Sequence, residues 1–173
     1  MNSNPDFSKI KAFVFDVDGV LSPSTVPVDD SGELCRMCNV KDGYAMQLAV
    51  RMGYKVAIIS GAISESIRHR FALFGISDVH LGVSVKLPKL MQWLEESNLT
   101  TDEVAFFGDD IPDYECMKAA GLSVAPADAA NDILQIADIV TPCNGGNGVA
   151  RYVIEMVMRS QGKWMSTEDA FKW

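Results

Sequence analysis

Short apolar runs alternate with longer helix-like stretches along most of the 173-residue chain. Each run is rich in β-branched or aromatic residues and has the length of one strand. Strands that alternate with helices, and that are apolar almost throughout, are typical of a parallel sheet that helices cover on both faces. The sequence therefore predicts an α/β fold with a doubly wound, mostly parallel sheet. Strands are expected at 12–15, 56–60, 79–82, 104–108, 122–125 and 138–140, and helices at 42–53, 64–75, 89–97, 112–121, 130–137 and about 149–161.

One segment, residues 22–41, does not follow this alternation. It contains prolines, then the turn-forming stretch DDSG, then further apolar residues, which predicts a β-hairpin with its turn near Asp30-Ser31-Gly32. Such a hairpin would project from the carboxyl end of the first strand. The length favours a single domain over residues 1–173, with the hairpin as a flap and residues 162–173 as a tail. The two tryptophans and the phenylalanine of the tail indicate that it docks, and a neighbouring subunit is one candidate surface.

Composition narrows the possible partners and location. The net charge of −8 argues against nucleic acids and anionic membranes as partners, because these are bound through excess lysine and arginine. No apolar run approaches the roughly 20 residues of a membrane span, and the N-terminal residues lack a signal-peptide pattern, so we expect a cytoplasmic protein. Cys35 and Cys38 have the spacing of half a zinc site. No second pair completes that site, so two ordinary reduced thiols are favoured.

Polar side chains follow four of the predicted strands, at the point where each strand ends. Because the carboxyl ends of parallel strands meet at one edge of a sheet, we expect these side chains to form one site. They are Asp16 and Asp18 after the first strand, Ser60 and Gly61 after the second, Lys86 after the third, and Asp109, Asp110 and Asp113 after the fourth.

The residue types indicate phosphoryl transfer assisted by a metal ion. Two or three carboxylates around one point suit a hard cation, and Mg²⁺ is the usual choice where phosphate is also bound. A lysine and a serine hydroxyl can hold the phosphate oxygens as donors. One aspartate can then attack phosphorus, and a second aspartate two residues on can protonate the leaving oxygen and later activate water. Each motif alone has a structural interpretation, as a turn, a helix cap or a solvated lysine, but the ordered set at four strand ends favours catalysis.

The order DVDGV, ISG, lysine and GDDxxD resembles the haloacid dehalogenase superfamily of phosphotransferases, over nearly the whole chain from Phe13 to about Glu155. The absence of a large inserted domain resembles the capless branch of that superfamily. Within this branch, the segments NVKDGYA, GDDIPD and GGNGVAR resemble the phosphatases that act on 3-deoxy-D-manno-octulosonate 8-phosphate, the precursor of an eight-carbon acid sugar of lipopolysaccharide. The resemblance implies an Mg²⁺-dependent phosphatase with a small phosphorylated acid sugar as its substrate.

The resemblance also implies a role for each matching position. Asp16 corresponds to the nucleophile and a metal ligand, and Asp18 to the general acid/base, which also binds Mg²⁺ through its backbone carbonyl. Asp109 completes the metal site. Such proteins are similar in forming tetramers in which a neighbour's C-terminus helps to close the site, so a homotetramer is expected. The other implied positions are the phosphate-binding Ser60, Gly61 and Lys86, the supporting Asp110 and Asp113, and the substrate-contacting Asp18, Asn39, Val40, Lys41, Asp42, Gly43, Gln47 and Arg70.

The chain departs from the pattern of this family at two places. Ser60-Gly61-Ala62 stands where the family usually has threonine-glycine-arginine, and DGVLSPS replaces the commoner DGVLTDG. The missing guanidinium is the natural partner of a substrate carboxylate, and Arg68 or Arg70 are candidates to replace it. A phosphatase of a related nine-carbon acid sugar 9-phosphate is therefore an alternative. A non-catalytic binding subunit with the same fold is an alternative from another class.

Overall fold

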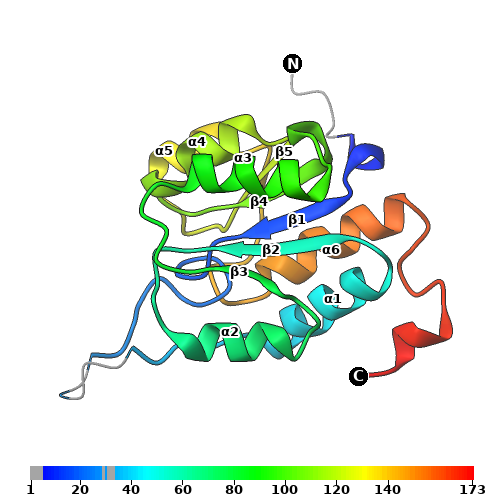
Figure 1. Ribbon diagram of the computed structural model, residues 1–173, viewed down its shortest axis with the longest axis horizontal. Coiled ribbons are helices and arrows are strands. Elements are labelled where there is room, and N and C mark those ends of the chain that lie inside the picture. Colours follow the sequence, from blue (N-terminus) through cyan, green and yellow to red (C-terminus); the bar gives the residue numbers. More distant parts are fainter. Residues whose placement is uncertain (1–5, 29, 31–33) are drawn as a thin grey trace.

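The sheet has six strands in the order β3-β2-β1-β4-β5-β6, and all neighbouring pairs are parallel. The structure is a computed structural model that describes residues 6–28, 30 and 34–173. The predicted doubly wound α/β fold is confirmed, because the chain starts in the middle of the sheet and builds outward in both directions (Figure 1). The strands are β1 (Ala12–Phe15), β2 (Lys55–Ile59), β3 (Asp78–His80), β4 (Val104–Phe107), β5 (Leu122–Ala125) and β6 (Ile139–Val140).

Helices cover both faces of the sheet, as Figure 1 shows. Alternate residues of β1 explain why, since Phe13 and Phe15 pack into one buried cluster while Ala12 and Val14 pack into the other. Helices α1, α2 and α6 contribute to the first cluster, and α3, α4 and α5 to the second. Their bounds are α1 (Val40–Arg51), α2 (Glu65–Ala72), α3 (Lys86–Ser97), α4 (Tyr114–Ala119), α5 (Asn131–Ile136) and α6 (Val149–Ser160).

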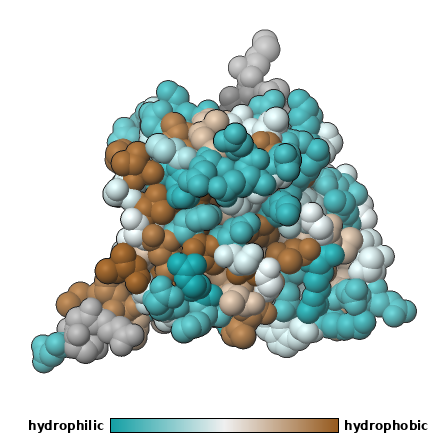
Figure 2. Space-filling model, viewed as in Figure 1, coloured by the Kyte–Doolittle hydropathy of each residue, from teal (hydrophilic) through white to brown (hydrophobic). Residues whose placement is uncertain are grey.

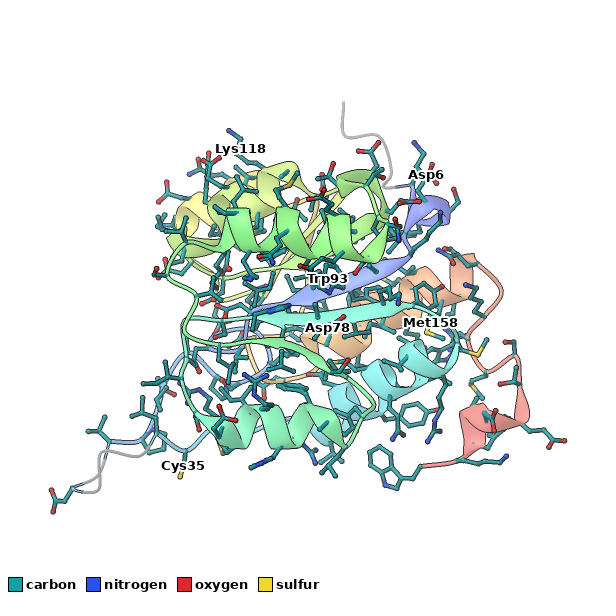
Figure 3. The ribbon with its side chains drawn as sticks, in the orientation of Figure 1. Asp6, Cys35, Asp78, Trp93, Lys118 and Met158 are labelled. Carbon is teal, nitrogen blue, oxygen red and sulfur yellow. The ribbon has the colours of Figure 1, made fainter. Side chains whose placement is uncertain are left out.

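Helix α3 begins three residues earlier than the sequence indicates, at Lys86 instead of residue 89. Pro88 made the earlier residues look non-helical, but a proline in the first turn costs little because the N–H that it lacks has no partner within the helix. Trp93 fixes the helix to the sheet, since its Nε1 donates to Oδ2 of Asp78 in β3 at 2.9 Å (Figure 3). Lys86 therefore stands on the first turn of an anchored helix.

The described residues of 22–39, here called the projecting segment, follow the loop at the carboxyl end of β1 and extend away from the body of the molecule (Figure 1). The predicted projection is present, but no strand is found among the described residues of this segment, and only Ser22 forms an isolated bridge, with Asp18. The prediction of β-pairing is therefore wrong for these residues. Pro23 and Pro27 lack the backbone donors that a ladder needs. The expected turn residues Ser31 and Gly32 lie outside the described residues.

The tail, residues 162–173, packs on its own chain (Figure 1). Trp164 is buried, with the guanidinium of Arg151 at 4.8 Å from its ring. The hydroxyl of Tyr44 donates to the carbonyl of Ala170, and Nη1 of Arg51 donates to that of Lys172 at 3.1 Å. The tail thus rests on α1 and α6. Across the described residues, no helix has both the length and the apolar character needed to cross a membrane.

Candidate active site

The polar residues predicted from the strand ends come together in one pocket of about 470 Å³ at the carboxyl edge of the sheet. Asp16 and Asp18 follow β1, Ser60 and Gly61 follow β2, and Lys86 begins α3. The loop after β4 supplies the acidic residues. The complete lining is Asp16, Asp18, Ser24, Ser60, Gly61, Ala62, Val83, Ser84, Lys86, Asp109, Asp110, Pro112 and Asp113.

Two glycines allow the carboxylates to approach one another. Gly19 has φ +82°, and a Cβ atom there would lie 1.9 Å from Oδ2 of Asp109. A Cβ atom on Gly108 would lie 2.4 Å from the Cβ atom of Asp113. Any larger residue at either position would displace an acidic side chain, so the glycines of DVDGV and GDD are part of the site's construction.

Three carboxylates form a cluster, since Asp16, Asp109 and Asp113 each offer an oxygen and these oxygens lie within 4.8 Å of one another. Burial, followed by the charge of Asp16, raises the pKa of Asp109 to about 7 and that of Asp113 to about 6. Mutual repulsion of this kind is relieved by a bound cation, and an all-oxygen donor set suits Mg²⁺. The residues present therefore fit a hard divalent ion.

Lys86 lies inside the site with its side chain only 4% exposed. Its Nζ atom is 2.8 Å from Oδ2 of Asp16 and 2.6 Å from Oδ1 of Asp113. Burial acts to lower the pKa of this ammonium, but the two carboxylates outweigh it and the pKa is raised. The second oxygen of Asp113 accepts from the backbone N–H of Asp109 at 3.2 Å, so Asp113 orients both the lysine and the metal-site loop.

Asp18 stands apart from the carboxylate cluster, and its side chain is paired with Arg36. Nε of Arg36 lies 2.6 Å from Oδ1 of Asp18, and Nη2 donates to Oδ2 at 2.8 Å. The hydroxyl of Ser22 also donates to Oδ1, at 3.2 Å. Binding of a metal by the backbone carbonyl of Asp18 stays a prediction.

Comparison with known proteins places this geometry in a family. Residues 74–153 match the family of haloacid dehalogenase-like hydrolases. The chain is 38% identical over 154 residues to the 3-deoxy-D-manno-octulosonate 8-phosphate phosphatase of Escherichia coli K12. The aligned region covers 89% of this chain and 82% of that protein. The chain belongs to the haloacid dehalogenase-like hydrolases.

Solved structures of such hydrolases have the same architecture. The 3-deoxy-D-manno-octulosonate 8-phosphate phosphatase of Yersinia pestis has a TM-score of 0.88 and 34% identity, covering 91% of this chain and 85% of that one. The phosphatase of the same name from Moraxella catarrhalis, in complex with a magnesium ion, a phosphate ion and the acid sugar, has a TM-score of 0.90 and 28% identity. It covers 96% of this chain and 95% of that one.

In this hydrolase, the remaining residues of the pocket have clear local roles. Ser60 is 1% exposed, and its Oγ accepts from the backbone N–H of Ala62 at 3.3 Å, which shapes the loop over Gly61. Asp110 accepts from the N–H of Ile111 at 2.8 Å and so begins the turn that leads to Asp113. Asp110 lines the pocket outside the carboxylate cluster.

The substrate-contacting positions inferred from the resemblance lie mostly outside this pocket. Asp42 is 1% exposed, and its Oδ1 accepts from the backbone N–H of Arg151 at 2.6 Å, so within the chain it caps the start of α6. Asn39 caps α1 through the N–H of Lys41 at 2.8 Å. Asp18 is the member of this set that lines the pocket at the sheet edge. The members that do not line it are Asn39, Val40, Lys41, Asp42, Gly43, Gln47 and Arg70.

Neither candidate for the missing guanidinium lines the pocket at the sheet edge or the one beside it. Nη1 of Arg68 donates to the carbonyl of Val79 at 2.7 Å. The guanidinium of Arg70 lies 4.6 Å from the centre of the Phe74 ring. The arginine that does reach the site is Arg36, which the sequence analysis missed. Its only signal was a single charged residue in the apolar stretch LCRMC of the projecting segment.

The CxxC motif does not form a metal site within the described residues. Cys35 is exposed on the projecting segment (Figure 3), and both Cys35 and Cys38 are free thiols. No group of metal-ligating side chains that includes either residue is found in the part of the chain that the structure describes. The interpretation of two ordinary thiols stays a prediction.

Proposed function

We propose that this chain is an Mg²⁺-dependent phosphatase that hydrolyses 3-deoxy-D-manno-octulosonate 8-phosphate to the free acid sugar and phosphate, in the synthesis of lipopolysaccharide precursors. The observation that supports this most strongly is the convergence of Asp16, Lys86 and Asp109 in a pocket that also holds Asp18. The relatives that carry this activity in their names are similar over most of both chains. The cofactor follows from the carboxylate cluster.

The proposed reaction has two steps. A carboxylate oxygen of Asp16 attacks phosphorus, the bond from phosphorus to the sugar oxygen breaks, and Asp18 gives its proton to that oxygen. Asp18 then takes a proton from water, which attacks the phosphoryl group on Asp16 and releases phosphate. Lys86 and the hydroxyl of Ser60 hold the phosphoryl oxygens as donors. When bound, Mg²⁺ neutralises the negative charge that would otherwise repel the attacking carboxylate.

The assembly and location of the protein are also part of this proposal. The projecting segment exposes Val28, Leu34 and Met37, and α2 is preceded by the exposed Ile63, which supports burial against other subunits of a homotetramer. Figure 2 shows apolar side chains gathered where the projecting segment leaves the body of the molecule. In such an assembly, the substrate contacts expected from residues 39–43, Gln47 and Arg70 would be made across subunits. A cytoplasmic location fits the cytosolic origin of phosphorylated sugars.

The test is phosphate release, with and without Mg²⁺, from the eight-carbon acid sugar 8-phosphate, its nine-carbon 9-phosphate analogue and simple hexose phosphates. The expected result is an Mg²⁺-dependent preference for the eight-carbon substrate, lost by several decades in Asp16→Asn. Asp102→Asn, which removes an exposed carboxylate, is the matched control. Preference for the nine-carbon analogue would make that compound the substrate and leave the proposed mechanism unchanged. Absence of turnover from folded, Mg²⁺-loaded protein would favour a binding subunit.

A further inference from the structure

A second pocket of about 570 Å³ adjoins the one that holds the carboxylate cluster. The two pockets share Asp18, Gly61 and Ala62, so a molecule with its phosphate beside Lys86 can extend past Asp18 into the second pocket. The part of the substrate that lies there is the part that distinguishes one phosphate ester from another. The lining is Asp18, Leu34, Arg36, Gly61, Ala62, Ile63, Ser64 and Glu65.

Among the described residues that line the second pocket, Arg36 is the one cation. Its side chain is 6% exposed, and Nη1 donates to the carbonyl of Leu34 at 3.2 Å, so the guanidinium is held in place. The other charged residues of the lining are Asp18 and Glu65, and Oε2 of Glu65 lies 3.2 Å from Nε of Arg68. Arg36 is therefore the residue of this pocket that can bind an anionic group.

The contact between Arg36 and Asp18 shows which kind of anion the guanidinium is aligned to hold. Two parallel hydrogen bonds, at 2.6 and 2.8 Å, join Nε and Nη2 to the two carboxylate oxygens. This fork geometry matches carboxylates and phosphates, and because the phosphate of the substrate lies beside Lys86, a carboxylate is the anion left for Arg36. Asp18 is 37% exposed and lines the pocket, so a carboxylate in the pocket can displace it from the fork.

Both oxygens of Asp18 are engaged by Arg36 in this arrangement, although the proposed reaction needs one of them at the leaving oxygen. We propose that Arg36 binds the carboxylate of the acid-sugar substrate and releases Asp18 in exchange, so that it is a specificity-determining residue. This inference rests on the proposed function. Arg68 and Arg70 do not compete for the role, because the first is bonded to the carbonyl of Val79 and the second lies against Phe74.

The test pairs a change in the protein with a change in the ligand. Wild type and Arg36→Ala are compared on the acid-sugar 8-phosphate and on its carboxamide, which keeps the phosphate and the sugar and lacks the negative charge. Arg36→Ala should lower kcat/KM for the acid by about 10- to 100-fold, mainly through KM, and for the amide by less than about 3-fold. Arg36→Lys should recover part of the loss. Arg159→Ala removes the same charge from the exposed end of α6 and is the control.

A second readout does not depend on turnover. Calorimetric binding of the free acid sugar should weaken in Arg36→Ala, while the melting temperature stays close to that of the wild type. Equal losses on acid and amide, or no loss on either, would overturn the role of Arg36 and leave the proposed function intact. A wild type that hydrolyses other phosphate esters and neither of these two would overturn the proposed function itself.

Discussion

The Nζ atom of Lys86 lies 2.6 Å from Oδ1 of Asp113, and neither side chain is more than 4% exposed. The same ammonium lies 2.8 Å from Asp16, so one cation compensates two buried carboxylates. Removing one partner from such a buried group of charges lowers the stability of the fold by more than the intact group contributes to it, because the charges left behind are unpaired. Lys86 thus serves the fold and the reaction at once.

Lys86→Met should lower the free energy of unfolding by about 2–4 kcal/mol at pH 8 in the absence of Mg²⁺, and should abolish phosphatase activity. Saturating Mg²⁺ should return part of the stability, because the ion takes over the compensation of the carboxylates. Denaturant unfolding with and without Mg²⁺ measures both effects. The control is Lys89→Met, one turn along α3, where Nζ donates to Oε1 of the exposed Gln92. An equal loss of unfolding free energy in Lys86→Met and Lys89→Met would contradict the role of Lys86 in compensating the buried carboxylates.

The carboxylate cluster could be predicted from the sequence because a parallel sheet brings the ends of its strands to one edge. Asp16, Lys86 and Asp109 each follow an apolar run that is easily recognised, so local pattern and topology were sufficient. The start of α3 was missed because Pro88 breaks the helix-like pattern in a turn where proline is tolerated.

Arg36 and Asp42 could not be placed in this way, because their roles depend on contacts between distant parts of the chain. Arg36 lies in a segment without periodicity, and nothing local shows that its guanidinium returns to Asp18. Asp42 has the sequence context of a helix start, but its Oδ1 accepts from Arg151, which lies 109 positions away. The contact between Asp42 and Arg151 follows from the packing of α1 against α6, which no local pattern specifies.

Gly19→Ala should weaken Mg²⁺ binding by at least about tenfold. The added Cβ atom would lie 1.9 Å from Oδ2 of Asp109, and the backbone at φ +82° also disfavours any side chain, so Asp109 must move away from the other carboxylates. Isothermal calorimetry with Mg²⁺ alone measures the dissociation constant directly.

Gly53→Ala provides the matched control for that measurement. Gly53 has nearly the same backbone angle, φ +87°, but nothing lies within 4 Å of its Cβ position. Alanine there should cost about 1 kcal/mol of stability and leave the Mg²⁺ affinity unchanged. Weaker binding in both variants would mean that stability, and not the position of Asp109, controls the affinity.

Asp42→Asn should remove part of the pH dependence of stability. Burial raises the pKa of Asp42 to about 6, although hydrogen bonds from the backbone of Arg151 and Gly148 act against it. Between pH 4 and pH 6 the folded state therefore binds more protons at this carboxyl than the unfolded state, and the stability that it contributes is lost as pH rises through that window. The amide has no such loss, so the variant should gain about 1–3 kcal/mol relative to the wild type from pH 4 to pH 8.

The prediction is about how the difference in free energy of unfolding between the two proteins changes with pH. The absolute value of this difference at one pH is not predicted, because the amide nitrogen needs a hydrogen-bond partner of its own. Denaturant unfolding at pH 4.5, 6 and 8 measures the difference, and the other titrating groups cancel between the two proteins. A difference in free energy of unfolding that stays constant from pH 4.5 to pH 8 would show that burial does not raise the pKa of Asp42. A raised KM for the acid-sugar phosphate in Asp42→Asn would instead support the substrate contact inferred from the resemblance.

Trp164→Ala should destabilise each protomer, and Trp173→Ala should not. Trp164 is 8% exposed and lies with its ring 4.8 Å from the guanidinium of Arg151 and 5.8 Å from that of Arg159, whereas Trp173 is 67% exposed. Truncating the buried tryptophan should lower the free energy of unfolding by about 2–4 kcal/mol, because apolar contacts and two cation–π contacts are lost. The exposed tryptophan should cost less than about 1 kcal/mol.

The dependence on protein concentration separates docking on the same chain from docking on a neighbour. If Trp164 stabilises its own protomer, the fall in melting temperature is the same at all protein concentrations, since no association step is involved. If it acts through a subunit interface, the fall is absent at concentrations where both proteins are monomeric and grows as concentration rises, because association then stabilises the wild type more than the variant. Light scattering on the Trp173→Ala variant completes the test. Trp173 is exposed in one chain, so it is the part of the tail that remains available to a second subunit, and the oligomeric state of the variant shows whether that contact is made.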